Sequence, residues 1–475
     1  MANDRFLYES ISQQLRNQIN SGSYSAGQRL PSVRRLSRLF GVSINTIVQC
    51  FRQLESDGYI ESRPRSGIFV RDHPPDAFVA ANLNHFPLLP VEVSLSEEIL
   101  HYMEPHTEQA LVHLGVALPA STVMPVDRVL RTLREVTRKH SQASWDYMHP
   151  HGHDVFAHQL ARRSLNYPIP INHAELIMTN GCMEAVQLAL RAVTQRGDTI
   201  AVETPSYYGT LVSLEVMQRK VLEIPTHYRD GICLYSLEQA LKRGQVAACL
   251  VSCNAQNPLG FSMSDERKQK LVALATRYEV PLIENDIWGD TVYRGDALPA
   301  KAYDEAGMVL YCNSFSKTLM PGMRLGWIAP GRFHHRVLEL KQISSITTAS
   351  APQLMMGRLM ENGFYAQHLT QLRRQLETQT TETAKAVLEA FPTGTRVDIP
   401  TGGCVLWVGL PRRIDARPLF EQALASGIHI FPGSVFSAGP RHFDYLRLNA
   451  GIPLDGRIRK AIGHLGEMVH GRYPA

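Results

Sequence analysis

The chain has 475 residues, of which 44% are hydrophobic and 20% charged, a composition that supports large buried cores and excludes a wholly disordered protein. No run of about 18 uncharged apolar residues occurs, so no membrane-spanning helix is expected. The polar N-terminal stretch predicts no secretion signal, and the seven cysteines include no CxxC pair, which favours reduced thiols and a cytoplasmic location.

The excess positive charge lies at the N-terminus. The net charge is +5, and residues 1–71 hold ten arginines, no lysine and five acidic side chains, whereas the remainder holds 39 basic and 39 acidic side chains. This asymmetry favours a small module that meets a polyanion, attached to a neutral body. A solvated basic surface without a partner is the alternative.

Residues 1–71 contain three helical patterns followed by a hairpin pattern. Apolar residues recur at helical spacing over 8–19, and Ser32 and Ser43 can each cap a following helix. Two short strand patterns around a turn occupy 59–70. This order predicts a winged helix-turn-helix.

The DNA-binding surface of such a module combines small or polar side chains on the recognition helix with basic groups on the preceding helix and the wing. A helical bundle with a charged surface is the alternative, but helix spacing and charge agree with the DNA interpretation. The candidate DNA-binding residues are Ser32, Arg34, Arg35, Ser43, Asn45, Thr46, Gln49, Arg63, Arg65 and Gly67.

The segments 27–32 (GQRLPS), 41–46 and 66–70 (SGIFV) resemble the GntR-type winged helix. This resemblance implies binding to a double-stranded operator. Relatives often carry arginine at the positions of Ile44 and Val48, so guanine readout from these two positions is not expected. Both side chains could instead touch thymine methyl groups.

Beyond the first module we expect a linker over 72–109 and an α/β body over 110–475. The linker segment 72–92 has four prolines and no steady period, and 94–104 could form a short helix. In the body, β-branched runs alternate with helical patterns, which predicts a mainly parallel sheet with ligand sites at the carboxyl ends of its strands. The predicted strands are 176–179, 199–202, 248–252, 280–284, 309–312 and 324–329.

Three motifs follow the first three of these strands. Gly181, with Cys182 and Met183, opens a helix whose N-terminus suits a phosphate, although a plain helix start is the alternative. Tyr207 could stack on a flat ring or belong to the core. Asn257, in the sequence NPLG, presents an amide toward the crevice.

The segment 314–327 carries the most specific pattern. A lysine after a buried strand is unusual, because burial and a nearby cation lower its pKa and leave a neutral amine that can attack an aldehyde. That lysine is Lys317, and Arg324 with the hydroxyls of Ser314 and Ser316 can hold a phosphate. Arg447, between two leucines, fits either a substrate carboxylate or a buried salt bridge.

Together these motifs, chiefly NPxG and SxxKxxxPGxRxG, resemble the fold-type I aminotransferases, with their large and small domains and their cofactor pyridoxal 5′-phosphate. The resemblance implies that Lys317 forms the internal aldimine and that Arg447 binds an amino-acid carboxylate. It further implies that the backbone of Gly181, Cys182 and Met183 holds the phosphate, with Ser314 and Arg324. Tyr207 would stack on the ring, Asn257 would bond the 3′-oxygen, and Tyr147 would reach the phosphate across a dimer interface.

One position departs from that family. Relatives place a carboxylate against the pyridine nitrogen, and a tyrosine three residues later; here these positions hold Asn285 and Trp288. Either a local bulge brings Asp286 to the ring, or Asn285 faces the nitrogen without charge. In the second case the ring is a weaker electron sink, which suits a sensor better than a catalyst.

The histidines at 149, 151, 153 and 158 could suggest a metal site. They lie in the segment 147–162, which is shared with relatives that bind no metal there, so we expect no metal.

A GntR-type winged helix joined to an aminotransferase-like body resembles the MocR subfamily of transcription regulators. The resemblance implies a homodimer that binds operator DNA and senses an amino acid, an amine or a B6 vitamer through Lys317. An active aminotransferase that carries a DNA-binding module is the alternative. A body that has lost its cofactor and only dimerises is less favoured, because Lys317 and Arg324 are intact.

Overall fold

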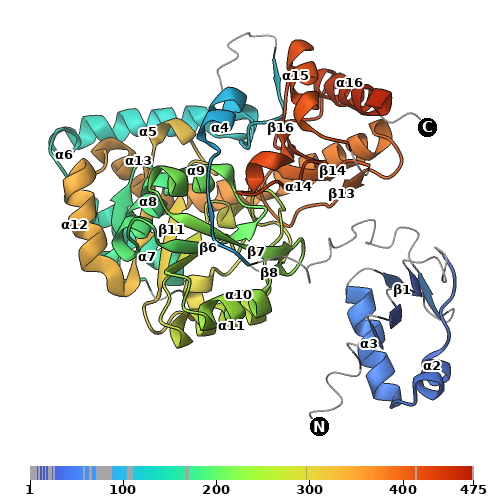
Figure 1. The fold of residues 1–475 in the computed structure, drawn as a ribbon. Helices are drawn as coiled ribbons and strands as arrows, with labels where there is room; N and C mark the ends of the chain where they lie inside the picture. Colours follow the sequence, from blue (N-terminus) through green and yellow to red (C-terminus); the bar gives the residue numbers. More distant parts are fainter. Residues whose placement is uncertain are drawn as a thin grey trace. The chain divides into compact units, whose positions relative to one another are not determined.

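The computed structural model describes residues 8, 11–12, 14–15, 18–19, 24, 27–56, 59–63, 67–70, 88–103, 111–165, 169, 171–295, 297–411 and 414–472. The chain divides into two compact units, residues 1–84 and 85–475. Figure 1 shows the helices and strands of both units.

The first unit is a winged helix-turn-helix, as predicted. Its elements are α2 Val33–Phe40, α3 Ile44–Ser56, β1 Ile60–Arg63 and β2 Gly67–Val70, and the described residues between 8 and 19 are helical. The backbone N–H of Arg35 donates to Ser32 Oγ at 3.4 Å and that of Thr46 to Ser43 Oγ at 3.1 Å, so both predicted caps are confirmed. Gly41, at φ +64°, ends α2 in the left-handed conformation that favours glycine.

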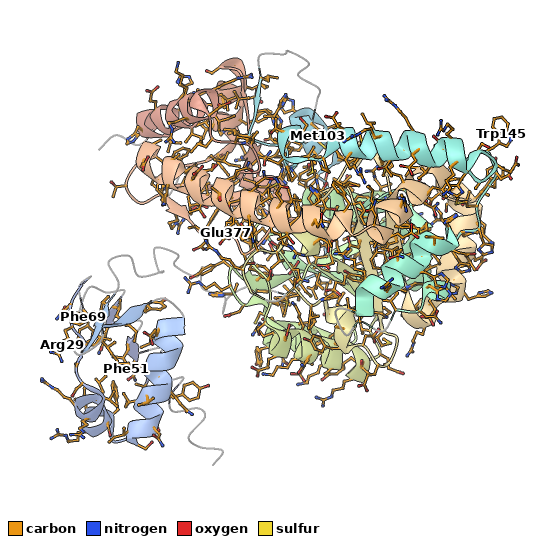
Figure 2. The ribbon with its side chains drawn as sticks, turned by 180° about the vertical axis from the view of Figure 1, so that it is seen from behind. Arg29, Phe51, Phe69, Met103, Trp145 and Glu377 are labelled. Carbon is orange, nitrogen blue, oxygen red and sulfur yellow. The ribbon has the colours of Figure 1, made fainter. Side chains whose placement is uncertain are left out.

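The core of this unit is formed by the faces that the helices turn toward the hairpin. Leu36 of α2 and Ile47 and Phe51 of α3 are buried together with Val70 of β2. Figure 2 labels Phe51 on α3, and Arg29 and Phe69 next to each other, where an isolated bridge joins them. The wing is thus tied both to the helices and to the segment before α2.

The second unit is built on a nine-stranded sheet with the order β3-β7-β6-β9-β10-β11-β12-β5, in which β8 pairs with β7. The five neighbours β7, β6, β9, β10 and β11 are parallel, and β12 is antiparallel to both β11 and β5. The predicted, mainly parallel sheet is confirmed. Its strands are β3 Val91–Glu92, β5 Ile177–Thr179, β6 Thr199–Thr204, β7 Lys220–His227, β8 Gly231–Ile232, β9 Ala248–Val251, β10 Leu282–Asn285, β11 Val309–Ser314 and β12 Gly326–Ala329.

Helices cover both faces of this sheet (Figure 1). Side chains alternate along each strand, so Ile200 and Val202 of β6 pack with α8 and α9, whereas Ala201 packs with α10 and α11. The helices of this part are α5 Val126–Lys139, α6 Ser141–Trp145, α7 Asp154–Leu165, α8 Cys182–Val193, α9 Tyr208–Val216, α10 Leu234–Lys242, α11 Asp265–Arg277, α12 His334–Ser345 and α13 Ser350–Glu361.

A smaller layer completes the second unit. It holds a four-stranded sheet in the order β13-β14-β17-β16, and a separate parallel pair formed by β15 and β4. Its elements are α14 Phe364–Ala390, α15 Arg417–Ala425, α16 Gly456–Arg472, β4 Val112–His113, β13 Arg396–Val397, β14 Val405–Gly409, β15 Ile428–His429, β16 Phe431–Pro432 and β17 Tyr445–Asn449.

Part of the segment that the sequence assigned to the linker packs on the second unit. Strand β3 joins the edge of the large sheet, and α4, Ser96–Met103, lies where a short helix was expected. The carboxylate of Glu215 accepts hydrogen bonds from the backbone N–H groups of Leu95 at 2.7 Å and Ser96 at 3.0 Å. Leu95 and Ile99 are buried in the core, which explains why this segment is ordered.

Within the described ranges, no helix combines the length and the apolarity that crossing a bilayer requires.

Candidate cofactor site and DNA-binding surface

A cavity of about 650 Å³ lies at the carboxyl ends of the parallel strands of the second unit. Its position agrees with the rule that ligands of open α/β sheets bind at this edge. The structure brings together in its wall these residues that the sequence predicted: Cys182, Met183, Tyr207, Asn257, Asn285, Trp288, Ser316, Lys317 and Arg324.

One end of the cavity has the shape and charge of a phosphate cradle. Helix α8 begins at Cys182, directly after Gly181, which has a φ of +85°. A Cβ atom at Gly181 would collide with the guanidinium group of Arg324. That group donates to Asn180 O at 2.8 Å and to Ser316 Oγ at 3.3 Å. A helix N-terminus, a guanidinium and a hydroxyl therefore converge, and they fit a phosphate dianion.

Lys317 lies between this cradle and the opposite wall. Its Nζ donates to Ala117 O at 2.6 Å and lies 5.0 Å from the centre of the Trp288 ring. Burial lowers the pKa of Lys317 to about 8; the nearby thiol of Cys404 opposes this shift, and the charges of Arg447 and Arg324 add to it. A substantial fraction of this amine is therefore neutral near neutral pH, as a nucleophile for an aldehyde requires.

Asn285, not Asp286, faces the cavity. Strand β10 keeps regular parallel register with β11 up to Asn285, which pairs with Cys312, and the backbone N–H of Asp286 still donates to Cys312 O at 2.9 Å. No bulge interrupts the strand, so neighbouring side chains point to opposite faces. The alternative that a bulge brings Asp286 to the ring is wrong.

The Asp286 carboxyl is held on the far side of the sheet. It accepts hydrogen bonds from the Tyr311 hydroxyl at 2.7 Å and from Asn254 Nδ2 at 3.1 Å. Burial, together with the charge of Glu284, raises the pKa of Asp286 well above its usual range. This acid therefore supplies no charge to the cavity.

The Cys182 thiol fixes the orientation of the Asn285 amide. Cys182 Sγ donates to Asn285 Oδ1 at 3.2 Å, and burial raises the pKa of this thiol well above neutral, so it remains a donor. Because Oδ1 is used in this contact, the amide N–H groups are left for the cavity. The wall at this point offers donors without formal charge.

Arg447 lies behind the cavity wall. It is 1% exposed, and its guanidinium lies over the rings of Phe431 and Phe436, with 5.0 Å from Cζ to each ring centre. It donates to Asn257 Oδ1 at 3.3 Å and, through Nη2, to Gly115 O. The carbonyl oxygen of Gly115 thus occupies one side of the guanidinium, and the role of Arg447 as a carboxylate site stays a prediction.

Two further predicted cofactor contacts lie outside the cavity wall. Ser314 is buried and does not line the cavity, and its hydroxyl accepts from the backbone N–H of Ser316 at 3.4 Å. Tyr147 is 83% exposed and does not line the cavity of its own chain. Its predicted role across a dimer interface stays a prediction.

Two imidazoles that no sequence motif indicated also line the cavity. His113 of β4 and His429 of β15 are paired in register, with their ring centres 6.1 Å apart. No local motif signals this pairing, since the two strands are more than 300 residues apart in sequence. Tyr208 also lines the cavity, and its place directly after the predicted Tyr207 is the signal in the sequence that could have indicated it.

Within the described residues, no group of three or more His, Cys, Asp or Glu side chains could hold a metal ion. The rings of His149 and His151 are stacked 4.5 Å apart, and His334 stacks on His151 at 5.3 Å.

The first unit presents most of its candidate DNA-binding side chains to solvent. Exposed are Ser32, Arg34, Arg35, Ser43, Asn45 and Gln49, together with Ile44. The prediction that Thr46 contacts DNA is wrong, because Thr46 is 3% exposed. Its hydroxyl lies 2.8 Å from Ser43 Oγ inside the first turn of α3. The side chain of Arg63 and the whole of Arg65 lie outside the described residues.

Gly67, also a candidate, has a structural requirement for glycine. Its φ is +114°, and a Cβ atom there would come within 2.6 Å of Arg29 Nε.

Comparisons with known proteins agree with both units. Residues 115–464 match the family of class I and II aminotransferases, and residues 7–70 match the gntR family of bacterial regulatory proteins. The chain is 35% identical to the uncharacterized HTH-type transcriptional regulator YdcR of Escherichia coli, over 98% of this chain and 99% of that protein. It is 30% identical to aromatic-amino-acid aminotransferase 1 of Thermococcus litoralis, over 76% of this chain and 88% of that protein.

Solved structures resemble the second unit. The kynurenine aminotransferase of Pyrococcus horikoshii, solved in complex with PMP, superimposes with a TM-score of 0.73 and 26% identity, covering 81% of this chain and 96% of that one. The multiple substrate aminotransferase of Thermococcus profundus gives a TM-score of 0.73 and 27% identity. The chain therefore belongs to the GntR-type transcription regulators that carry an aminotransferase class I and II body, the MocR architecture, and this body is of the family that uses pyridoxal 5′-phosphate.

Proposed function

We propose that the chain is a transcription regulator that binds operator DNA through α3 and the wing, and that senses an amino acid, an amine or a B6 vitamer through pyridoxal phosphate at Lys317. The arrangement around Lys317 carries this proposal: a partly neutral amine lies between a phosphate cradle and an uncharged amide wall. A regulator of chromosomal genes works in the cytoplasm, and this location is part of the proposal.

The residues of the cavity fit the cofactor. The backbone N–H groups of Cys182 and Met183, with Ser316 and Arg324, would hold its phosphate, Tyr207 would contact its ring, and Asn257 its 3′-oxygen. When bound, pyridoxal phosphate supplies an aldehyde with which amines condense. Lys317 supplies the amine of the protein, and its lowered pKa makes that group reactive.

Asn285 favours sensing over turnover. A carboxylate at this position would stabilise a positive charge on the opposing ring nitrogen, and each unit of pKa so gained is worth about 1.4 kcal/mol. The amide N–H groups left free by the Cys182 contact instead suit an uncharged, accepting nitrogen. With pyridoxal phosphate held here, Lys317 and an effector amine would compete for its aldehyde, and the uncharged amide of Asn285 would give little support to the proton transfers that transamination needs.

The effector carboxylate would bind at Arg447. To reach the guanidinium it must compete with the carbonyl oxygen of Gly115 and with Asn257 Oδ1. Gly115 is held closely, since a Cβ atom there would collide with the imidazole of His429. Binding of a carboxylate would therefore displace the backbone that follows β4, and this is the conformational change that we propose the regulator uses.

A homodimer is the other part of the proposal. Trp145 and Tyr147 are 86% and 83% exposed, and Figure 2 shows Trp145 projecting outward at the tip of α6. Large exposed aromatic side chains are typical of protein interfaces. Sedimentation of wild type and of Trp145→Ser tests this: a dimer that weakens in the variant supports it, and a monomeric wild type contradicts it.

The DNA-binding experiment uses the full chain. An operator is first selected from a random duplex library, and its affinity is then measured by fluorescence anisotropy with and without pyridoxal phosphate and a panel of amino acids and amines. We expect wild type and the control Lys220→Ala, an exposed lysine on β7, to respond to these additions. We expect Lys317→Ala to keep basal DNA binding and to lose the response.

A response that persists unchanged in Lys317→Ala would refute sensing through this residue. The intact Lys317, Arg447 and Asn257 also permit an active aminotransferase. Fast and complete transfer of an amino group from one amino acid of the panel, followed by stopped-flow absorbance, would favour that function instead.

A further inference from the structure

A second cleft, of about 450 Å³, lies between α7, the end of α13 and the start of α14. It shares no lining residue with the cavity around Lys317. Gln159, Arg162 and Arg163 project into it from one face of α7, because they are three and four residues apart. Tyr365 and Arg373 reach it from α14, two helical turns apart. Three arginines thus meet in one concave site.

Too few carboxylates face these arginines. Asp290 pairs with Arg163 Nη2, and its backbone O accepts from Arg373 Nε at 2.8 Å. Burial alone would raise the pKa of Asp290, but the charges of Arg163 and Arg373 hold it below its ordinary value. Asp290 is therefore negatively charged, and its charge is already paired with Arg163.

Asp290 does not line the cleft, and the carboxylate that does line it, Glu361, is already paired elsewhere. Glu361 accepts from Arg358 Nη1 at 3.0 Å, and Arg358 does not line the cleft. Arg162 makes no ion pair or side-chain hydrogen bond within the part of the chain that the structure describes. The cleft therefore carries surplus positive charge, with guanidinium donors of Arg162 and Arg373 available for a ligand.

We propose that this cleft is a binding site for a small organic molecule that carries a phosphate group. Two guanidinium groups on facing walls suit a dianion better than a single carboxylate. Met360, Ala366 and Leu369 give the remaining wall an apolar character that would receive the organic part. The volume is within the range of about 300–1,000 Å³ that small-molecule sites occupy.

The cleft is joined to the cofactor cavity by short contacts. The Tyr365 hydroxyl donates to Asp290 Oδ2 at 3.0 Å and is hydrogen-bonded to Thr318 Oγ1 at 2.9 Å. Thr318 is the residue after Lys317, and Asp290 lies two residues after Trp288, whose ring contacts Lys317. A ligand in the cleft would therefore act, through Tyr365, on the segment that carries Lys317 and on the segment that carries Trp288. This coupling, unlike the binding itself, rests on the proposed function of Lys317.

Phenyl phosphate is a suitable probe, and its binding to the full chain is measured by isothermal titration calorimetry. The protein is first saturated with pyridoxal phosphate and then freed of the excess by gel filtration, so that the phosphate cradle near Arg324 is filled. We expect Arg162→Gln to weaken binding about tenfold or more, the effect of losing a charge-assisted hydrogen bond. The matched control Arg138→Gln, at an exposed arginine on α5, should bind as wild type does. Thermal melts confirm that both variants are folded.

Several results would overturn the site. Absence of heat with wild type at millimolar probe, or equal affinity of wild type and Arg162→Gln, contradicts it. Binding that Arg324→Gln abolishes and Arg162→Gln leaves intact assigns the probe to the cofactor cradle. Displacement of the probe by a short DNA duplex of unrelated sequence would assign the cleft to nucleic acid.

The coupling between the cleft and the cofactor cavity is measured in a separate experiment. It compares the visible absorbance and the pyridoxal phosphate affinity of the wild type with and without saturating phenyl phosphate. A change in either that Arg162→Gln removes supports the coupling. Binding without any such change refutes the coupling and leaves the site standing. A chain that takes up no pyridoxal phosphate but still binds the probe through Arg162 refutes the proposed function alone.

Discussion

The reactivity of Lys317 gives the most quantitative prediction. Burial and nearby arginines lower its pKa from 10.5 to about 8. At pH 7 about one-tenth of such amines are uncharged, against about three in ten thousand for an amine with the ordinary pKa. We therefore expect Lys317 to take up pyridoxal phosphate about 300-fold faster than a solvent-exposed lysine of equal intrinsic reactivity.

The assay is stopped-flow absorbance of the cofactor-free chain mixed with pyridoxal phosphate, from about pH 6.5 to pH 10. Since only the neutral amine reacts, the rate should rise about tenfold per pH unit below the pKa of Lys317 and level off above about pH 8. In Arg447→Met a nearby positive charge is lost, so the pKa of Lys317 rises and the plateau moves to higher pH. Lys317→Ala, which lacks the amine, should show no fast phase.

A rate that keeps rising to pH 10 would mean that the environment of Lys317 does not favour its neutral form, and the reasoning from burial would be wrong. A plateau that stays at the same pH in Arg447→Met would show that the guanidinium has no electrostatic influence on the amine.

Four further substitutions test other parts of the structure. Asn285→Asp should speed amino-group transfer in single-turnover experiments by about tenfold for each 1.4 kcal/mol gained, and an unchanged rate would count against the role of the amide. Gly181→Ala should weaken pyridoxal phosphate binding in spectral titrations, because its Cβ atom collides with Arg324 and the positive φ adds about 1–2 kcal/mol; DNA affinity should be kept. Arg34→Ala, at an exposed position, should reduce the slope of log affinity against log salt by about 0.9 for every DNA sequence, and a sequence-dependent loss would contradict a phosphate contact. Leu36→Ala, fully buried, should cost the first unit about 2–5 kcal/mol in denaturant unfolding.

The sequence was sufficient to predict the role of a residue where that role depends on its neighbours in sequence. Ser32 and Ser43 cap the helices that follow them, as their position before a helical pattern predicted. Asn257 and Lys317 follow buried strands, and parallel strands bring their carboxyl ends to one edge, so both line the same cavity.

The sequence was less informative where the surroundings of a side chain depend on packing between distant segments. The covering of Arg447 by Gly115 joins segments that are more than 300 residues apart, as does the pairing of His113 with His429. Such long-range contacts follow from tertiary packing and have no period or spacing in the sequence.

The regular pairing of β10 has a consequence for how this cavity can change. Asp286, one of the two acids adjacent to Asn285 in sequence, is held by the pleat on the opposite face, with Tyr311 and Asn254 as its partners. Thermal motion cannot exchange the two neighbours without breaking the ladder on both sides of the strand. The charge of this wall of the cavity therefore depends on the residue type at position 285, and a substitution there is the direct way to place a carboxylate in the wall.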